Sequence, residues 1–296
     1  MLIPLLKTMR PRQWLKNGFA LVPLLFDGNI SVERIINAMI AFGLLCLMSS
    51  AVYIMNDLSD IEEDKKHPKK KYRPLPAGEL NPVVAGVAGI LCAAGSFALG
   101  WLLSVPFALI LLTYLVVQIA YTFWLKHVVL LDVLVVSLGF VLRIAAGATA
   151  INVREHSPWM YIFGGFLALF MILGKRRQEM VLLGDSAGKH RKVLNEYNLD
   201  LVDRLLGIVT TSAIVSYSLY TFLSSNTEGN PLMMFSIPFV IYGLFRYMYL
   251  IHVRGEGGAP EEVLLRDRSM QINLILWGIV VTAALYIPNI FPNLIN

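Results

Sequence analysis

The chain has 296 residues, of which 56% are hydrophobic and only 15% are charged. Soluble domains carry roughly a quarter of charged residues, so this composition excludes an ordinary soluble domain. The net charge of +5 does not favour nucleic acid as a partner, because the basic residues stand beside apolar segments, where anionic lipid or phosphate is the better partner. Cys46 and Cys92 both lie inside apolar segments, so neither a disulfide scaffold nor a metal–thiolate site is expected.

The apolar segments predict an all-α, polytopic membrane protein in which residues 1–296 form a single integral membrane domain. Most of them approach the roughly 20 residues that a helix needs to cross a bilayer core. With one shorter segment they predict nine spans, at 18–26, 38–55, 83–103, 105–123, 128–151, 160–173, 205–223, 233–251 and 272–287.

The basic residues at the start of the chain argue against a cleaved signal peptide. Lys7, Arg10, Arg12 and Lys16 form a long basic stretch before the first span, and no small-residue cleavage site follows it. The first span is therefore expected to be retained.

The other basic residues predict the orientation in the cell (inner or plasma) membrane. Of the 25 Lys and Arg residues, only Arg34 and Arg154 fall on one side, while Arg143 and Arg246 lie within spans. By the positive-inside rule the N-terminus is cytoplasmic and the C-terminus outside, as an odd number of spans requires. Two cytoplasmic loops, at about 58–82 and 175–203, are expected to carry the active site.

A cluster of acidic residues continues the span 38–55. At 100° per residue, Asp57, Asp60 and Asp64 project within an arc of about 60°, and Asn56 lies one turn before Asp60. Like charges at this spacing repel each other, so a cation among them is expected. Oxygen ligands without His or Cys favour Mg²⁺ or Ca²⁺, and Mg²⁺ characteristically bridges carboxylates to substrate phosphates.

A solvated acidic helix end, balanced by Lys65 and Lys66, is the alternative interpretation of this cluster. Its place at the end of an apolar span favours a functional site. His67 and Pro68 end the helix, and a basic loop follows in which the positive-inside rule accounts for most of the lysines. Arg73 stands in a stiffer stretch before a proline, and its planar fork suits a phosphate contact.

The acidic cluster resembles a known motif. The pattern Asn56-Asp57-x-x-Asp60-x-x-x-Asp64, followed by Arg73-Pro-Leu-Pro-Ala-Gly78, is similar to the first aspartate-rich motif of the UbiA superfamily of intramembrane prenyltransferases. The resemblance implies a nine-helix bundle whose cavity lies on the cytoplasmic side and opens laterally to lipid. That fold agrees with the spans and the orientation predicted from the residues.

The second cytoplasmic loop departs from the pattern of members that use aromatic acceptors. Those members carry a second aspartate-rich motif after the sixth span, whereas this chain has Gly174-Lys175-Arg176-Arg177-Gln178-Glu179, with one carboxylate. Other stretches resemble the branch of decaprenyl-phosphate phosphoribosyltransferases, and the likeness covers nearly the whole chain. These stretches are Arg10-Pro-Arg12-Gln-Trp14-Leu-Lys16-Asn17, Trp124-Leu-Lys126-His127 with Asp132, Gly139-Phe-Val-Leu-Arg143-Ile-Ala-Ala-Gly147, and Glu261-Glu262-x-x-x-Arg266-Asp267-Arg268.

That branch implies a Mg²⁺-dependent pentosyltransferase of the phosphoribosyltransferase type. The donor is 5-phosphoribosyl diphosphate, the acceptor is a polyprenyl (decaprenyl) phosphate, and the product is a lipid-linked precursor of cell-wall arabinan. Asp57, Asp60 and Asp64 are expected to act in catalysis by holding Mg²⁺ against the departing diphosphate. The acceptor phosphate is already anionic at neutral pH, so no strong general base is required.

Two anionic substrates need positive charge besides the metal ion. Lys175 and Arg176 are assigned to the ribose 5-phosphate or the diphosphate, and Lys16 with Arg12 to the lipid phosphate, although any of them could simply anchor a helix at the interface. The substrate-binding residues expected in full are Asn56, Lys16, Arg12, Asn17, Arg73, Lys175, Arg176, Glu179, Arg143, Tyr121 and Asp267.

Some of these residues have simpler alternative roles. Glu179 lies one turn after Lys175, so a local ion pair is equally expected. Asp267 stands between two arginines that would neutralise it. Arg143 lies inside a span and needs a partner, for which Asp132 qualifies only if the helix bends or another span intervenes. Packing is the alternative role for the tyrosines of the span 105–123, Tyr121 among them.

Two other functions remain as alternatives. The chain could transfer a prenyl group from a prenyl diphosphate to an aromatic acceptor, as superfamily membership would allow. A cation-coupled transporter is the third, but transporter sites usually lie near the bilayer midplane and this cluster lies at a membrane face. Whether the chain forms a homo-oligomer is left open.

Overall fold

The computed structural model describes residues 2–68, 70–153, 155–183, 192–224, 227, 230–256, 263 and 266–290, and these residues form helices and no strand. Eight helical segments within them are long and apolar enough to cross a membrane. They match eight of the nine predicted spans, which confirms an all-α integral membrane protein. The eight are Val32–Ser59, Pro82–Leu103, Val105–Phe123, Leu131–Ala150, Pro158–Leu182, Leu199–Leu223, Pro231–His252 and Arg268–Ile287.

The remaining predicted span, 18–26, is divided between two shorter elements. They are the 3-10 helix η1 (Pro11–Leu21) and the helix α2 (Val22–Phe26).

The chain forms two compact units. The first comprises Met1–Leu24, Asn29–Lys126 and Leu142–Val153, and the second comprises Leu25–Gly28, His127–Val141 and Arg154–Asn296. Both α2 and α7 (Leu131–Ala150) run from one unit into the other. The expected single membrane domain therefore stays a prediction.

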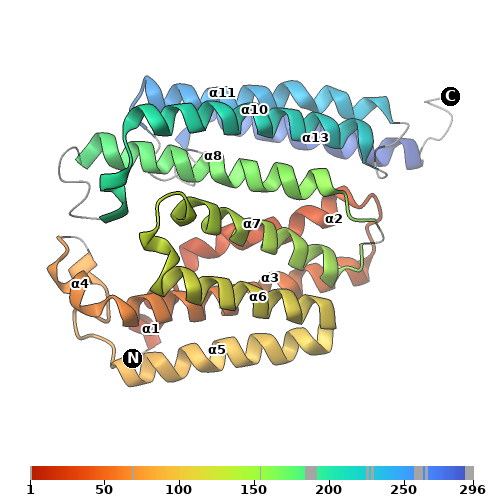
Figure 1. Cartoon of the computed structure of the whole chain (residues 1–296). Coiled ribbons are helices and arrows are strands. Elements are labelled where there is room, and N and C mark those ends of the chain that lie inside the picture. Colours follow the sequence, from red (N-terminus) through yellow and green to blue (C-terminus); the bar gives the residue numbers. More distant parts are fainter. Residues whose placement is uncertain are drawn as a thin grey trace. The chain divides into compact units, whose positions relative to one another are not determined.

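In the first unit, α3 (Val32–Ser59) contacts α1, η1, α4, α5 and α6 (Figure 1). Small residues let its neighbours approach: Ser96 of α5 donates a hydrogen bond to the Leu44 carbonyl of α3 at 2.7 Å. The Ser31 side chain accepts from the backbone N–H of Arg34 and so caps the start of α3. The elements are α1 (Leu2–Met9), η1, α3 (Val32–Ser59), α4 (Ile61–Lys66), η2 (Lys70–Tyr72), α5 (Pro82–Leu103) and α6 (Val105–Phe123).

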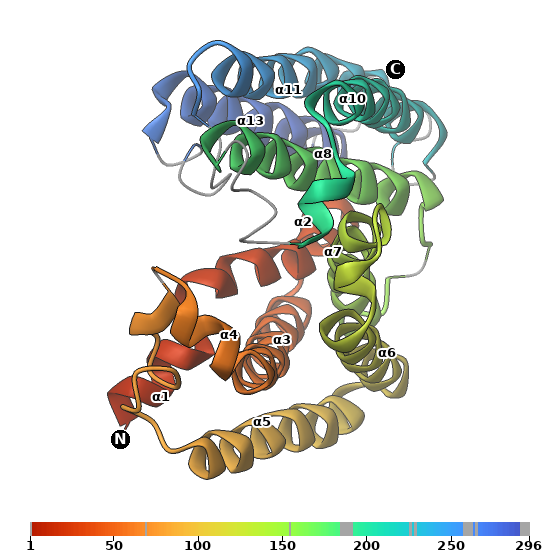
Figure 2. The ribbon, with the colours of Figure 1, turned by 60° about the vertical axis from the view of Figure 1, so that its left-hand side comes forward.

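In the second unit, α10 packs on α8, and α11 contacts both α10 and α13 (Figure 2). Asn198 caps α10, because its side chain accepts from the Leu201 N–H at 2.8 Å. Gly174 allows α8 to approach α11, since a Cβ there would lie 2.7 Å from an Ile251 side-chain carbon. The elements are α8 (Pro158–Leu183), η5 (Lys192–Glu196), α10 (Leu199–Leu223), η6 (Pro231–Ser236), α11 (Ile237–His252) and α13 (Arg268–Ile290), with η3 (Leu125–His127) at the boundary between the units.

Candidate functional site

The predicted acidic face is interrupted at Asp60. Helix α3 ends at Ser59, and Asp60 leaves helical geometry with φ −103° and ψ 9° before α4 begins. The Ser59 hydroxyl contacts the Asn56 carbonyl at 2.9 Å and the Asp60 carboxylate at 3.0 Å, an arrangement in which a serine competes with the helix for backbone groups. The expectation that one continuous helix carries all three carboxylates is therefore wrong.

Arg73 nevertheless brings two of the three carboxylates together. Its Nη1 donates to Asp57 Oδ1 at 3.1 Å and to Asp64 Oδ2 at 2.7 Å. A turn follows Arg73, in which the Ala77 N–H donates to the Arg73 carbonyl and Gly78 adopts a φ of 75° that favours glycine. The loop that follows α4 thus folds back, so that its Arg73 contacts Asp57 and Asp64 in the preceding helices.

Further cations surround the same carboxylates. Arg10 donates to Asp57 Oδ1, Lys70 Nζ lies 3.3 Å from Asp64 Oδ1, and Lys126 Nζ lies 3.0 Å from Asp60 Oδ1. The side chains of Asp57 and Asp64 are only 3% and 2% exposed. Buried carboxylates require such partners, because removal of one member of a buried pair costs about 3–5 kcal/mol.

Arg10 reaches Asp57 from the N-cap of η1, where its φ of 55° is left-handed. Its guanidinium also stacks over the Tyr53 ring, 4.9 Å from the centroid. Sequence reasoning did not select Arg10, Lys70 or Lys126 as site residues. Two signals in the sequence could have identified two of these residues. Arg10 and Lys126 lie inside stretches that carry the family resemblance, and Lys126 is the single Lys or Arg between the spans 105–123 and 128–151.

Arg143 and Asn17 join in a buried polar network of the first unit. Arg143 Nε donates to Asn17 Oδ1 and its Nη2 donates to the Tyr114 hydroxyl, both at 2.8 Å. Asn17 Nδ2 in turn donates to Ser49 Oγ at 3.1 Å, which ties η1 to α3. Asp132, the conditional candidate partner of Arg143, belongs to the other unit and pairs there with Arg176.

Replacing Tyr114 by Phe should destabilise the protein by about 1–3 kcal/mol, because Arg143 is buried and would lose a hydrogen-bond acceptor. Tyr242→Phe is the matched control, since that tyrosine is 46% exposed. Thermal unfolding in detergent should show a lower Tm for the first variant and an unchanged Tm for the second. Equal Tm values would show that the network contributes nothing to stability.

Four other predicted residues of the first unit lie nearer the surface. Arg12 is exposed, whereas Lys16 and Tyr121 are partly exposed. Asn56, one turn before Asp60, is also partly exposed. Their expected contacts with substrates stay predictions.

In the second unit, the predicted basic segment lies at the end of α8. Arg176 is buried, with its Nε 3.3 Å from Asp132 Oδ2 and its Nη1 2.7 Å from Glu179 Oε2. Glu179 therefore pairs with Arg176, three residues earlier, whereas the sequence suggested Lys175. Lys175 itself is exposed.

Asp267 pairs with Arg246 of α11. Two contacts join them, from Arg246 Nε to Oδ1 at 3.2 Å and from Nη2 to Oδ2 at 2.7 Å. Asp267 also caps α13, because its Oδ1 accepts from the Met270 N–H at 2.8 Å. The predicted Glu261 and Glu262, and the part 184–191 of the second loop, lie outside the described residues.

The hydrogen bond from Arg246 lowers the pKa of Asp267 below its ordinary value. A lowered folded-state pKa stabilises the protein above the unfolded pKa of about 3.9, and this contribution is lost as the pH falls through the folded pKa. Asp267→Asn keeps the helix cap and removes the ion pair, so it should lower Tm at pH 7 by only a few degrees, with the difference constant down to pH 5.

The control for this variant is Asp200→Asn, which breaks the exposed Arg204–Asp200 pair and should leave Tm unchanged. A Tm difference between Asp267→Asn and the unmodified chain that vanishes already at pH 5 would contradict the lowered pKa of Asp267.

The donor chemistry of the acidic cluster fits a hard divalent cation, since it consists of carboxylate oxygens. Among the residues that the structure describes, no three His, Cys, Asp or Glu side chains are grouped closely enough to hold a metal ion. Arg73 lies between Asp57 and Asp64 and satisfies both. A metal ion would have to share these carboxylates with Arg73 or displace it, so the predicted Mg²⁺ site stays a prediction.

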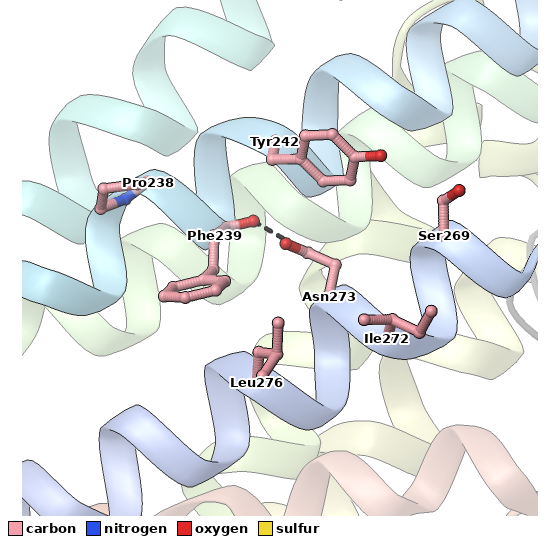
Figure 3. Close-up of a pocket in the computed structure, with 7 residues that line it drawn as sticks. All are labelled: Pro238, Phe239, Tyr242, Ser269, Ile272, Asn273 and Leu276. Carbon is pink, nitrogen blue, oxygen red and sulfur yellow. Dashed lines mark hydrogen bonds between the residues drawn. The ribbon is translucent and has the colours of Figure 1, made fainter.

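A groove of about 520 Å³ lies between α11 and α13 (Figure 3). The Asn273 amide donates to the Phe239 carbonyl at 2.9 Å and joins its two walls. None of the predicted site residues lines it. The lining residues are Pro238, Phe239, Tyr242, Ser269, Ile272, Asn273 and Leu276.

Solved structures share this fold. A UbiA homologue from Archaeoglobus fulgidus bound to DMAPP and Mg²⁺ superimposes with a TM-score of 0.72 at 18% identity, over 95% of this chain and 98% of that one. A structure of digeranylgeranylglyceryl phosphate synthase gives a TM-score of 0.68 at 13% identity, over 96% and 98%. At these identities the likeness concerns the fold alone.

Curated relatives are closer in sequence. The decaprenyl-phosphate phosphoribosyltransferase of Mycolicibacterium smegmatis is 35% identical over 95% of this chain and 92% of its own length. That of Corynebacterium glutamicum is 34% identical over 97% and 88%. The model of the UbiA prenyltransferase family matches residues 19–275. The chain therefore belongs to the UbiA prenyltransferase family and is a membrane-embedded transferase.

Proposed function

We propose that this transferase moves the phosphoribosyl group of 5-phosphoribosyl diphosphate to a polyprenyl phosphate, decaprenyl phosphate in the first instance, and releases diphosphate. The observation that carries the proposal is the 33–35% identity to decaprenyl-phosphate phosphoribosyltransferases over nearly the whole chain. The basic segment Lys175-Arg176-Arg177, where aromatic-accepting members have acidic residues, supports the same choice. The product would then serve the synthesis of cell-wall arabinan.

In the proposed reaction, the bond between ribose C1 and the diphosphate oxygen breaks, and its electron pair leaves with the diphosphate. An oxygen of the lipid phosphate forms the new bond to C1. That oxygen carries negative charge at neutral pH, so the chain needs no strong base to activate it. The demand on the protein is to bring together two anions and to stabilise the leaving group.

Asp57, Asp60 and Asp64 are the proposed ligands of Mg²⁺, which when bound would neutralise charge on the departing diphosphate. Arg73 and Arg10 hold Asp57, the former together with Asp64, and orient these buried carboxylates. Both guanidinium groups remain about 30% exposed, so they can also meet phosphate oxygens.

The other predicted cations complete this proposal. Lys175 and Arg176 would supply positive charge to the phosphate groups of the donor, and Lys16 and Arg12 to the lipid phosphate. The distribution of basic residues supports an orientation with the N-terminus and both active-site loops on the cytoplasmic side. The soluble, charged donor would then approach from the cytoplasm and the acceptor from the bilayer.

The test uses the purified full chain in detergent or lipid nanodiscs with labelled 5-phosphoribosyl diphosphate, decaprenyl phosphate and Mg²⁺. A labelled lipid-linked phosphoribose should form together with diphosphate, and omission of the lipid or chelation of the metal should stop both. Diphosphate release without a labelled lipid product, or no turnover at all, would overturn the proposal.

Prenyl transfer to an aromatic acceptor is the competing outcome, since the family as a whole bears the name of prenyltransferases. Incubation with a labelled prenyl diphosphate and 4-hydroxybenzoate separates the two functions. A prenylated aromatic product would favour the alternative. The earlier alternative of a transporter is set aside, because family membership makes the chain a transferase.

A further inference from the structure

The last turns of α8 are fixed by three neighbouring elements. Arg177 Nε lies 2.6 Å from Asp203 Oδ1 of α10. Gln178 donates from Nε2 to the Gly255 carbonyl, just beyond the end of α11. Arg176 pairs with Asp132 near the start of α7. Consecutive side chains thus tie one helix end to three others, which is more than a solvated basic helix end would need.

The pairing of Arg176 is deeply buried. Asp132 is fully buried, and the Arg176 side chain is only 6% exposed. Because a buried ion pair is costly to desolvate, it is weak evidence for stability, but the loss of either partner would leave an unpaired buried charge. Glu179 Oε2 accepts a hydrogen bond from Nη1 of the same guanidinium at 2.7 Å. Arg176 therefore has two carboxylate partners within its own unit.

Tyr197 holds Asp132 in place. Its hydroxyl donates to Asp132 Oδ1 at 2.6 Å and accepts from the Leu130 N–H at 2.9 Å. Leu130 has a left-handed φ of 67°, a strained conformation for a bulky residue, which this hydrogen bond helps to maintain. Burial raises the pKa of Tyr197 to about 12, so its hydroxyl stays protonated as the donor at neutral pH.

Lys175 differs from the residues that follow it, because it is exposed whereas Arg176 and Gln178 are buried. One residue step along a helix turns the side chain by about 100°. Fixing Arg176 therefore also fixes the direction in which Lys175 leaves α8. An ammonium group suits a phosphate contact as a point charge, and it needs only correct placement.

We infer that Arg176, Asp132 and Tyr197 are positioning residues, and that Lys175 is the residue of this segment that contacts the phosphate groups of the donor. This inference deepens the proposed function and rests on its diphosphate-containing donor. It divides the roles of the two cations: Arg176 holds the helix end through its buried carboxylates, and Lys175 meets the ligand.

The test is a double-mutant cycle on binding of inorganic diphosphate with Mg²⁺, measured by calorimetry on the full chain. Lys175→Ala and Asp132→Asn should each weaken binding about tenfold, the size expected for loss of one charge-assisted contact. If Asp132 acts only through the placement of Lys175, the double variant should bind no more weakly than Lys175→Ala alone.

Two further variants keep the test decisive. Tyr197→Phe removes one hydroxyl and is the milder change, for use if Asp132→Asn does not fold. It should weaken diphosphate binding a few-fold, and only when Lys175 is present. Arg204→Gln removes an exposed cation of α10 and should leave binding unchanged.

If the losses of affinity of the two single variants multiply in the double variant, the inference is overturned, because Arg176 would then contact the ligand independently of Lys175. Unchanged diphosphate binding by folded Asp132→Asn or Tyr197→Phe would also overturn it. The proposed function fails separately, if the unmodified chain binds diphosphate but makes no lipid-linked phosphoribose.

Discussion

Replacing Asp57 by Asn should lower the rate of phosphoribosyl transfer by about 10²–10³-fold, the loss typical when one preorganised electrostatic group is removed from an active site. Asp57 is the proposed metal ligand that two arginines contact, since Arg10 and Arg73 both reach its Oδ1. An amide of the same shape would leave Arg10 without its carboxylate, would leave Arg73 with Asp64 alone, and would remove a ligand for the metal. The measurement is labelled lipid product formed per unit of protein across a Mg²⁺ titration.

Asp60→Asn tests the effect on transfer activity separately from the effect on stability. Asp60 is 25% exposed, and among the contacts in the described part of the chain its ion pair is with Lys126. This variant should lose transfer activity while keeping Tm within a degree or two, whereas Asp57→Asn should also lose stability because its site is buried. Glu62→Gln is the control, since Glu62 is 77% exposed and pairs locally with Lys65. Normal turnover in both aspartate variants would refute the metal-site assignment.

Much of the fold could be predicted from the sequence, because the length of an apolar segment identifies a membrane span. The span 105–123 coincides with α6, and 83–103 differs from α5 by one residue. Polar residues at helix ends were less predictable. Helix α8 continues through the basic segment to Leu183, since lysine and arginine are good helix formers and tertiary contacts hold the segment. Hydropathy alone ends that span ten residues earlier.

The candidate site was only partly predictable. Local spacing grouped Asp57 with Asp64, and Arg73 contacts both, but the spacing placed them on one regular helix. The break at Asp60 depends on the Ser59 hydroxyl, a local competition that helical periodicity does not contain. Partners from distant segments were missed for another reason: Arg10 and Tyr197 acquire their contacts from tertiary folding, which local spacing does not show.

Gly147 gives the second large expected effect, on stability. A Cβ at this position would lie 1.9 Å from the carbonyl oxygen of Ala20 and 2.7 Å from its carbonyl carbon. These are backbone atoms of η1, so they cannot rotate away as a flexible side chain could. Helix α7 and η1 therefore meet backbone to backbone, and only glycine permits that contact.

Gly147→Ala should destabilise the protein by about 3 kcal/mol or more, because η1 must move away from α7. The shift would also pull Asn17 from Arg143 and Arg10 from Asp57, so activity should fall in the fraction that still folds. Gly95→Ala is the matched control: Gly95 lies inside α5 with no atom within 4 Å of its Cβ position, and alanine there should be neutral or stabilising. Thermal unfolding and size-exclusion chromatography in detergent compare the two, and equal Tm values would mean that η1 does not depend on this contact.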